Sequence, residues 1–207
     1  MNPPSPVNTE LELARALLGR EPMNPRAWLG LGKVLEQQYR HAEALKVYRE
    51  GMARLPCEAG LKQAVGILLM HGGKLWQALP LLESALAASS EPAPELLEAL
   101  AGVLLELGQV ERAHHLLSAG DGERTMTRVL LALAEQQLGR PEQAIGHYQR
   151  ALELTEPGSS QAARICHNLG NLYCLAGELP AAEAAFAQAL EHSPGLARTQ
   201  LQLDLLQ

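Results

Sequence analysis

Residues 163–196 read ARICHNLGNLYCLAGELPAAEAAFAQALEHSPGL, and this stretch contains the pattern that decides the fold. An alanine, Ala182, follows the small residue Gly170 by twelve positions and precedes the bulky Phe186 by four. Gly177 lies between Gly170 and Ala182, where a turn would fall. The stretch predicts two antiparallel helices joined by that turn, because glycine commonly ends a helix. The small residue lets the helices approach each other, and the bulky side chain fills the neighbouring gap.

The pattern occurs five times, in copies that begin near Pro25, Ala59, Pro94, Thr125 and Ala163. Successive copies are 34, 35, 31 and 38 residues apart, measured between the recurring alanines Ala44, Ala78, Ala113, Ala144 and Ala182. Four copies have a turn glycine, at Gly73, Gly108, Gly139 and Gly177, and Tyr39 replaces it in the first. A period of about 34 residues indicates stacked helix pairs, because one pair cannot bury its apolar face alone.

The amino-acid composition agrees with a helical fold. Leu and Ala dominate the 47% of residues that are hydrophobic, whereas only 3% are aromatic. Strands favour β-branched and aromatic residues, while Ala and Leu lose little side-chain freedom in a helix. The composition therefore predicts an all-α protein and argues against sandwiches, barrels and doubly wound enzyme folds. A charged fraction of 19% also argues against a disordered chain.

The charge pattern argues against nucleic-acid binding. The chain has 17 basic and 23 acidic residues, a net charge of −6. Its lysines, Lys33, Lys46, Lys62 and Lys74, are scattered and form no basic run. Binding to a phosphate backbone requires clustered Lys and Arg. We therefore expect no nucleic-acid partner.

Signals for export and membrane insertion are missing from the sequence. The first residues lack the basic and apolar segments of a signal peptide, and no stretch of about 18 apolar residues occurs. Three cysteines without a CxxC motif argue against a disulfide framework or a structural zinc site. We expect a cytoplasmic protein without membrane insertion, and the Lys-poor, Leu/Ala/Arg-rich composition hints at a bacterial source.

The five copies resemble the tetratricopeptide repeat (TPR) family, whose pattern is W-x2-L-G-x2-Y…A-x3-F…P. The first copy matches it through Trp28, Leu31, Gly32, Leu35, Ala44, Tyr48 and Pro56. The fifth copy matches it through Leu169, Gly170, Tyr173, Ala182, Phe186 and Pro194, with Cys166 at the Trp position. Copies two and three are degenerate, with Lys62 and Leu97 at the Trp position. The resemblance covers residues 25–196.

We therefore expect an all-α, right-handed superhelical solenoid of five helix-turn-helix repeats with a capping helix at each end. A flexible Pro-rich N-terminus at 1–7 and a capping helix at 8–24 come first. The repeats follow at 25–58, 59–93, 94–124, 125–162 and 163–196. A capping half-repeat at 197–207 ends the chain.

Motifs of phosphate binding and nucleophilic catalysis are incomplete. The Gly73–Lys74 pair resembles a phosphate-binding loop, but Leu75 stands where Ser or Thr would hold magnesium. Ser118 and Gly120 match only part of a nucleophile elbow, and no strand is expected before them. The sequence thus provides no nucleophile or acid–base pair, and we expect no enzyme activity.

Metal binding is not expected either. His114 and His115 are adjacent, so on a helix they point about 100° apart and cannot share a metal ion. Cys166 aligns with a position that faces the partner helix, and we interpret it as a core residue beside a surface His167. We expect neither a metal site nor a cofactor.

The resemblance implies a concave groove lined by repeat positions 2, 5, 9, 12 and 13 of each first helix. The candidate groove residues are Arg26, Leu29, Lys33, Gln63, Ile67, Met70, Glu98, Met126, Val129, Leu133, Gln137, Arg164, His167 and Asn171. Seven apolar residues at such positions are unexpected on a solvated face: Leu29, Ile67, Met70, Leu105, Met126, Val129 and Leu133. They indicate either a binding site or burial against the next repeat, and both interpretations stay open.

The family is also known for capturing acidic C-termini of chaperones in a two-carboxylate clamp. The resemblance places Leu29 and Lys33 where the clamp needs Lys and Asn, and Ala64 where it needs Asn. Glu95 and Ala99 replace its remaining cations. We do not expect a chaperone-tail receptor of that type.

The leading hypothesis is a non-catalytic scaffold, adaptor or assembly chaperone that binds a protein or peptide segment in its groove. One alternative is a self-associating scaffold, a homo-oligomer formed through the concave face or the solenoid ends. Another is an accessory module of a separate enzyme. Repeat scaffolds serve many unrelated functions, so the sequence does not name the partner.

Overall fold

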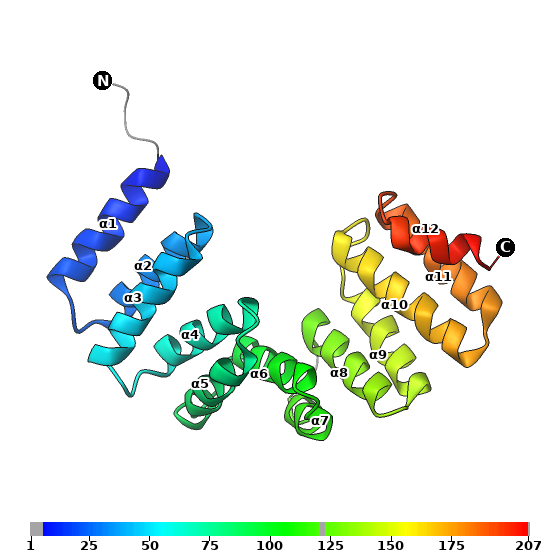
Figure 1. Ribbon diagram of the computed structural model, residues 1–207, viewed down its shortest axis with the longest axis horizontal. Helices are drawn as coiled ribbons and strands as arrows, with labels where there is room; N and C mark the ends of the chain where they lie inside the picture. The colour runs from blue at the N-terminus through cyan, green and yellow to red at the C-terminus, as the bar shows by residue number, and fades with distance from the viewer. Residues whose placement is uncertain (1–5, 121–122, 207) are drawn as a thin grey trace. The chain divides into compact units, whose positions relative to one another are not determined.

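The computed structural model describes residues 6–120 and 123–206 and shows twelve helices and no strand in these ranges (Figure 1). The helices are α1 (Pro6–Arg20), α2 (Pro25–Gln37), α3 (His41–Arg54), α4 (Ala59–His71), α5 (Leu75–Ala87), α6 (Pro94–Glu106), α7 (Val110–Ser118), α8 (Thr125–Gln137), α9 (Pro141–Glu153), α10 (Ser160–Ala176), α11 (Leu179–His192) and α12 (Ala197–Asp204). The all-α fold predicted from composition is confirmed. No helix in the described part of the chain is long and apolar enough to cross a membrane.

The chain divides into two compact units, Met1–Val103 and Leu104–Gln207, which we call unit 1 and unit 2. The division falls inside α6. In unit 1 the helix pair α2–α3 contacts the pair α4–α5, and in unit 2 the pair α8–α9 contacts the pair α10–α11. The two units are described separately below.

Helix boundaries differ from the expected segments at two places. Pro6 and Val7 are helical, although we expected a flexible segment at 1–7, and residues 1–5 of that segment lie outside the described residues. The helix expected near Ala163 begins at Ser160, because the Ser159 side chain caps it by accepting a hydrogen bond of 3.1 Å from the Ala162 backbone N–H.

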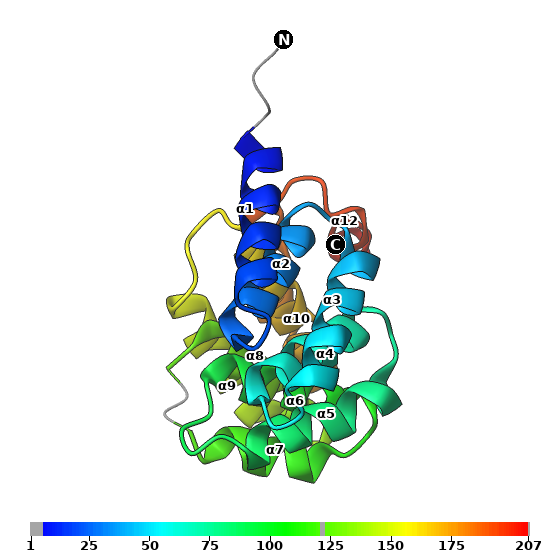
Figure 2. The same cartoon turned by 90° about the vertical axis from the view of Figure 1, so that its left-hand side faces the viewer.

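Unit 1 contains the pairs α2–α3 and α4–α5, with α1 against α2 (Figure 2). Trp28 of α2 is buried, and its indole N–H donates a 2.9 Å hydrogen bond to the Pro22 carbonyl. The Arg54 guanidinium lies 5.4 Å from the centre of the Trp28 ring. A Cβ at Gly32 would overlap the Tyr48 ring. The expected pairing of a small residue on the first helix with a bulky residue on the second is therefore confirmed in this repeat.

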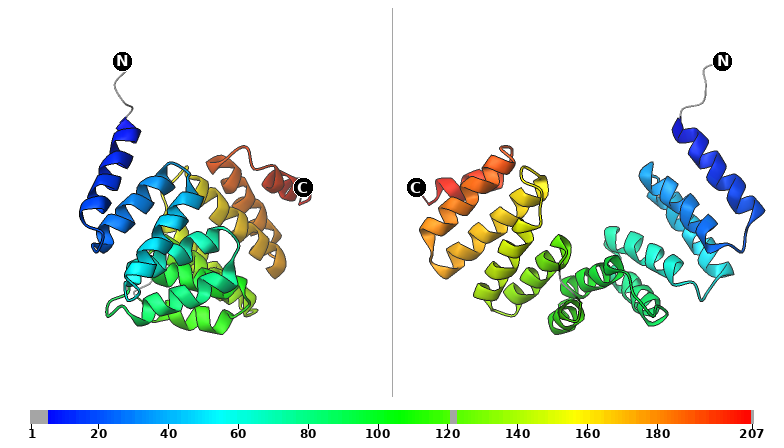
Figure 3. Two further views of the ribbon diagram at one scale, coloured as in Figure 1. Left: turned by 60° about the vertical axis from the view of Figure 1, so that its left-hand side comes forward. Right: turned by 180° about the vertical axis from the view of Figure 1, so that it is seen from behind.

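Unit 2 contains the pairs α8–α9 and α10–α11, with α12 against α11 (Figure 3). Its core is a cluster of buried side chains from α8, α9, α10 and α11, and Tyr148 is the largest of them. A Cβ at Gly170 would lie 2.5 Å from the Phe186 ring, so the small–bulky pairing holds here too. Cys166 is buried, as expected for a residue at the Trp position of the repeat.

The turns within the repeats share one backbone conformation. Gly73, Gly108, Gly139 and Gly177 all have φ between 70° and 76°, in the left-handed region that glycine tolerates best. Tyr39 occupies the equivalent position of the first repeat with φ of 58°. The five turns marked in the sequence are therefore confirmed.

Candidate functional site

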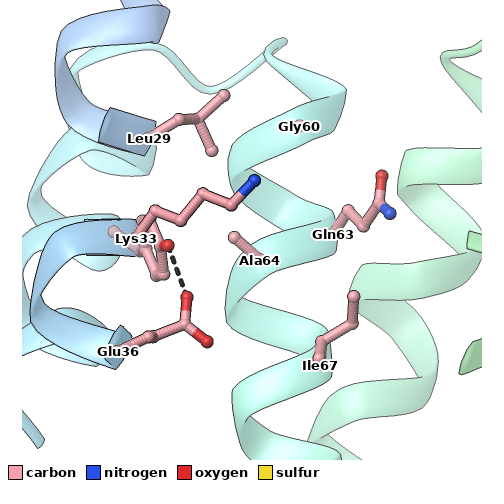
Figure 4. A pocket seen from close by; sticks show the side chains of 8 residues that line it. Leu29, Lys33, Glu36, Gly60, Gln63, Ala64 and Ile67 are labelled. Atoms are coloured by element: carbon pink, nitrogen blue, oxygen red, sulfur yellow. Dashed lines mark hydrogen bonds between the residues drawn. The ribbon is translucent and has the colours of Figure 1, made fainter. Parts of the chain in front are cut away.

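In unit 1, an open pocket of about 330 Å³ lies between the successive first helices α2 and α4 (Figure 4). Its apolar wall consists of Leu29, Ala64 and Ile67, with Gly60 leaving room beside Leu29. Its polar residues are Lys33, Glu36, Gln63 and Tyr48. We call this space the α2/α4 pocket. It combines an apolar surface with side chains that can both donate and accept hydrogen bonds.

The polar end of the α2/α4 pocket is held in place by a buried tyrosine. The Tyr48 hydroxyl donates a 2.6 Å hydrogen bond to Oε1 of Glu36. Burial, together with Glu36, raises the pKa of Tyr48, so its hydroxyl stays protonated and remains a donor. Figure 4 shows Lys33 extending from α2 toward α4 near Ala64. A charged amine and a fixed carboxylate thus lie along one edge of an apolar surface.

In unit 2, α8 and α10 form a second pocket of about 330 Å³. We call it the α8/α10 pocket, and it is lined by Met126, Val129, Ser160, Gln161, Arg164, Ile165 and Asn168. Met126 is 46% exposed. Apolar side chains from α8 therefore face a polar rim on α10, an arrangement similar to that of the α2/α4 pocket.

A third pocket, the α10/α12 pocket, is open to solvent, has a volume of about 240 Å³ and is lined by Arg164, His167, Asn168, Leu196, Arg198 and Thr199. Arg164 and Asn168 also line the α8/α10 pocket, so the two pockets adjoin. The Asn168 side-chain amide donates a 3.2 Å hydrogen bond to the Tyr148 hydroxyl, and burial raises the pKa of that hydroxyl to about 12. Tyr148 is therefore neutral at physiological pH.

His167 lines the α10/α12 pocket and is part of a hydrogen-bonded network. Its Nδ1 lies 2.9 Å from the Thr199 hydroxyl oxygen, and its Nε2 lies 3.2 Å from the side-chain nitrogen of Asn171. Its ring also packs on Phe186, with ring centres 5.6 Å apart. Burial, and to a lesser degree the charge of Arg198, lower the pKa of His167. His167 was expected on the surface, but it is half-buried because α12 packs over it.

The structure brings together eight of the fourteen candidate groove residues at these three pockets. In unit 1 they are Leu29, Lys33, Gln63 and Ile67. In unit 2 they are Met126, Val129, Arg164 and His167. The six that do not line these pockets are Arg26, Met70, Glu98, Leu133, Gln137 and Asn171.

Burial explains part of the apolar character at the groove positions. Leu105 is only 5% exposed, and Leu133 is half-buried against the core cluster of unit 2. Val129 packs against the same cluster and also lines the α8/α10 pocket. Burial thus accounts for Leu105 and in part for Leu133 and Val129, whereas a binding role for the apolar residues that line the pockets stays a prediction.

Several lining residues escaped the sequence analysis. Tyr48 was assigned to packing alone, although its hydroxyl lies at the α2/α4 pocket. Arg198 and Thr199 belong to the segment interpreted only as a cap. A signal for Arg198 was present, because it follows Arg164 by 34 residues and so occupies the same repeat position.

Another polar cluster of unit 2 lies outside these pockets. The Glu135 carboxylate is buried, with Oε1 2.8 Å from Nε2 of His114 and Oε2 3.3 Å from a guanidinium nitrogen of Arg140. His114 comes from α7 and Glu135 from α8, so the cluster links two helices. Within residues 6–120 and 123–206, no three His, Cys, Asp or Glu residues gather closely enough to hold a metal ion.

Comparison with known families identifies the repeats. Two family models described as tetratricopeptide repeat match residues 11–56 and 123–194. A third model, described as anaphase-promoting complex, cyclosome, subunit 3, matches residues 73–151. No curated protein matches the sequence significantly.

Solved structures agree with this assignment. The TPR protein YrrB, described as having an unusual peptide-binding site, superimposes with a TM-score of 0.72 at 17% identity over 94% of this chain and 99% of its own. The type IV pilus biogenesis factor PilW superimposes with a TM-score of 0.78 at 18% identity over 95% of this chain and 98% of its own. A chain of the APC/C hetero-tetramer Cut9-Hcn1 superimposes with a TM-score of 0.80 at 21% identity, over 97% of this chain and 39% of the matched chain. These structures agree in fold, and the two tetratricopeptide repeat models, which together match more than half of the chain, show that it belongs to the tetratricopeptide repeat family.

Proposed function

We propose that this protein is a non-catalytic scaffold, an adaptor or assembly chaperone that binds a segment of a partner protein on the first helices of its repeats. The observation that carries the proposal is the recurrence of one kind of pocket in both units. The α2/α4 and α8/α10 pockets each place apolar side chains beside hydrogen-bonding groups. Binding pockets commonly combine an apolar lining with a few polar groups that orient the ligand.

The apolar and the polar lining residues of the α2/α4 pocket would contribute differently to binding. Burial of a partner's apolar side chain against Leu29, Ala64 and Ile67 supplies affinity, because apolar surface leaves water. Lys33 and Gln63 provide donors for carbonyl groups of a bound segment. TPR proteins are generally protein-binding scaffolds, which is consistent with this use of the pocket.

A random-peptide phage library panned on the full chain tests the proposal. We expect enrichment of related peptides, with affinities then measured by fluorescence anisotropy. Ala64→Arg places a long side chain in the α2/α4 pocket and should weaken peptides that bind there by about tenfold or more. Ala53→Arg, on the exposed side of α3, is the matched control and should leave the affinity unchanged. Failure to enrich any peptide, or equal affinities for both variants and the parent, would argue against this site.

Self-association remains a second candidate because of exposed leucines on the terminal helices. Leu13 and Leu17 of α1 are exposed, as are Leu201 of α12 and Leu205, the residue that follows this helix. Residues four apart share one face of a helix, so each pair forms an apolar stripe. Light scattering over a range of concentrations should show a mass that rises with concentration. A constant monomer mass would eliminate this candidate.

A further inference from the structure

Arginines in unit 2 fall into two groups. Unit 2 contains no lysine, and its arginines are Arg112, Arg124, Arg128, Arg140, Arg150, Arg164 and Arg198. The first five all contact other side chains or charged groups of the protein. Among the described residues, the side chains of Arg164 and Arg198 form no ion pair and no hydrogen bond. These two arginines line the same pocket, the α10/α12 pocket.

Arg164 and Arg198 lack acidic partners among the described residues, although unit 2 is rich in acidic residues. Acidic residues outnumber arginines there, and Arg150 alone is shared between Glu123 and Glu153, at 2.8 Å and 2.6 Å. Carboxylates for pairing are therefore abundant on the rest of the unit. Arg164 and Arg198 nevertheless face a pocket whose lining includes no acidic residue. Two unpaired cations that line one pocket repel each other, so an anion bound between them would be favoured.

Groups around the two arginines do not neutralise them. Tyr148 is protonated, since burial raises its pKa to about 12. His167, whose pKa is lowered, adds no negative charge. Asn168 contributes an amide, and Thr199 a hydroxyl. The α10/α12 pocket is thus cationic and contains neutral polar groups, unlike the α2/α4 pocket, where Glu36 lies near Lys33.

We propose that the α10/α12 pocket binds the side-chain carboxylate of an Asp or Glu residue in the partner segment. Arg164 on α10 and Arg198 on α12 can each donate to the carboxylate, and guanidinium–carboxylate hydrogen bonds are stronger than neutral ones. Because the α8/α10 pocket adjoins through Arg164 and Asn168, it takes an apolar side chain close to the acidic residue in the same segment. This proposal rests on the proposed function and adds the chemistry of the ligand.

The same phage library tests the chemistry. We expect an enriched peptide class with Asp or Glu within a few residues of a large apolar residue. In synthetic peptides of that class, replacing the acidic residue by its amide should weaken binding by about tenfold, as should Arg198→Glu in the protein. Changing the peptide's acidic residue to Lys should restore part of the affinity for Arg198→Glu. Affinity for the parent protein should fall with rising salt.

Controls separate this proposal from the proposed function. Arg49→Glu makes the same charge change on the exposed side of α3 and should bind like the parent. Arg198 is exposed, so its variant should keep the helical circular-dichroism spectrum. Three outcomes would overturn the carboxylate site and leave the scaffold proposal standing. The enriched peptides could lack acidic residues, Arg198→Glu and Arg49→Glu could bind with equal affinity, or binding could depend on a free C-terminal carboxylate alone. No enrichment at all would overturn both.

Discussion

At the scale of single residues, the turn position shows how one backbone conformation selects its residue. Four repeats place glycine there, at φ between 70° and 76°, and the first repeat places Tyr39 at 58°. A side chain in this region brings Cβ close to the following carbonyl, at a cost of about 1–2 kcal/mol. Tyr39 is 85% exposed and makes an edge contact with His41, so little packing offsets that cost.

Replacing Tyr39 by glycine should therefore stabilise the protein. Glycine removes the backbone strain of the folded state, and this gain in stability exceeds the loss caused by the greater conformational entropy of glycine in the unfolded chain. We expect a net gain of about 0.5–1 kcal/mol in the free energy of unfolding. Urea unfolding followed by circular dichroism measures it. Gly139→Ala, at a turn where a Cβ meets nothing within 4 Å, should lose about 1 kcal/mol by the reverse effect. A destabilised Tyr39→Gly variant would show that the Tyr39 side chain stabilises the turn.

At the scale of helices, the first and fifth repeats both bring a glycine of the first helix close to an aromatic ring of the second. In the fifth repeat, Gly170 of α10 lies under the Phe186 ring of α11. In the first, Gly32 of α2 lies under Tyr48 of α3. The aromatic ring occupies the space that a side chain on the first helix would need, so helix spacing depends on both residues together.

Gly170→Ala should disrupt this contact, because its Cβ would lie 2.5 Å from the Phe186 ring. We expect a loss of about 1–3 kcal/mol in unfolding free energy, despite the better helix propensity of alanine. Gly146→Ala is the matched control, since Gly146 lies within α9 with nothing within 4 Å, and it should gain about 0.5–1 kcal/mol.

A double variant checks the cause of the Gly170→Ala effect. Gly170→Ala combined with Phe186→Leu should lose less stability than the sum of the two single variants, because the smaller side chain makes room for the methyl group. Strict additivity would mean that the two residues do not compete for the same space.

At the scale of the whole molecule, the groups that respond to pH are unevenly distributed. Both histidines with a lowered pKa, His147 and His167, lie in unit 2. Burial is the main cause for both, and the charge of Arg128 adds to it for His147. Nη1 of Arg128 lies 3.3 Å from Nδ1 of His147, an arrangement that suits a neutral ring accepting a hydrogen bond.

Mild acid should therefore destabilise unit 2. A histidine whose folded-state pKa is lowered binds its proton more readily in the unfolded state, so its contribution to stability is present above the ordinary value of 6.5 and is lost as the pH falls below it. Urea unfolding at about pH 7.5 and about pH 5.5 should show lower stability in acid. In the variant His147→Gln/His167→Gln the difference should shrink, and an undiminished difference would assign the effect to other groups. The hydrogen bond from Arg150 lowers the pKa of Glu123, so this carboxylate does not contribute to the difference.

Much of the fold follows from local patterns that a reader can find in the sequence. Gly177 marks its turn, and the spacing of Gly170 and Phe186 predicted that the two residues pack together. Both features depend only on residues within one helix pair. The start of α10 was less accurate, since it depends on the capping side chain of Ser159. The pocket-lining residues were partly missed because the repeat position of a residue does not show which neighbouring helix packs over it.

The order of amino acids alone specified the helix pairs, their turns and the absence of an evident catalytic motif, because these features depend on short-range spacing that recurs along the chain. Tertiary packing decided which groove positions stay open. Leu105 is buried, whereas Met126 is exposed, although both occupy groove positions of the repeat. Packing also brought Arg198 of α12 beside Arg164 of α10. The exposure of a side chain and its proximity to other charged side chains depend on the neighbouring helices, whose positions are set only when the chain folds.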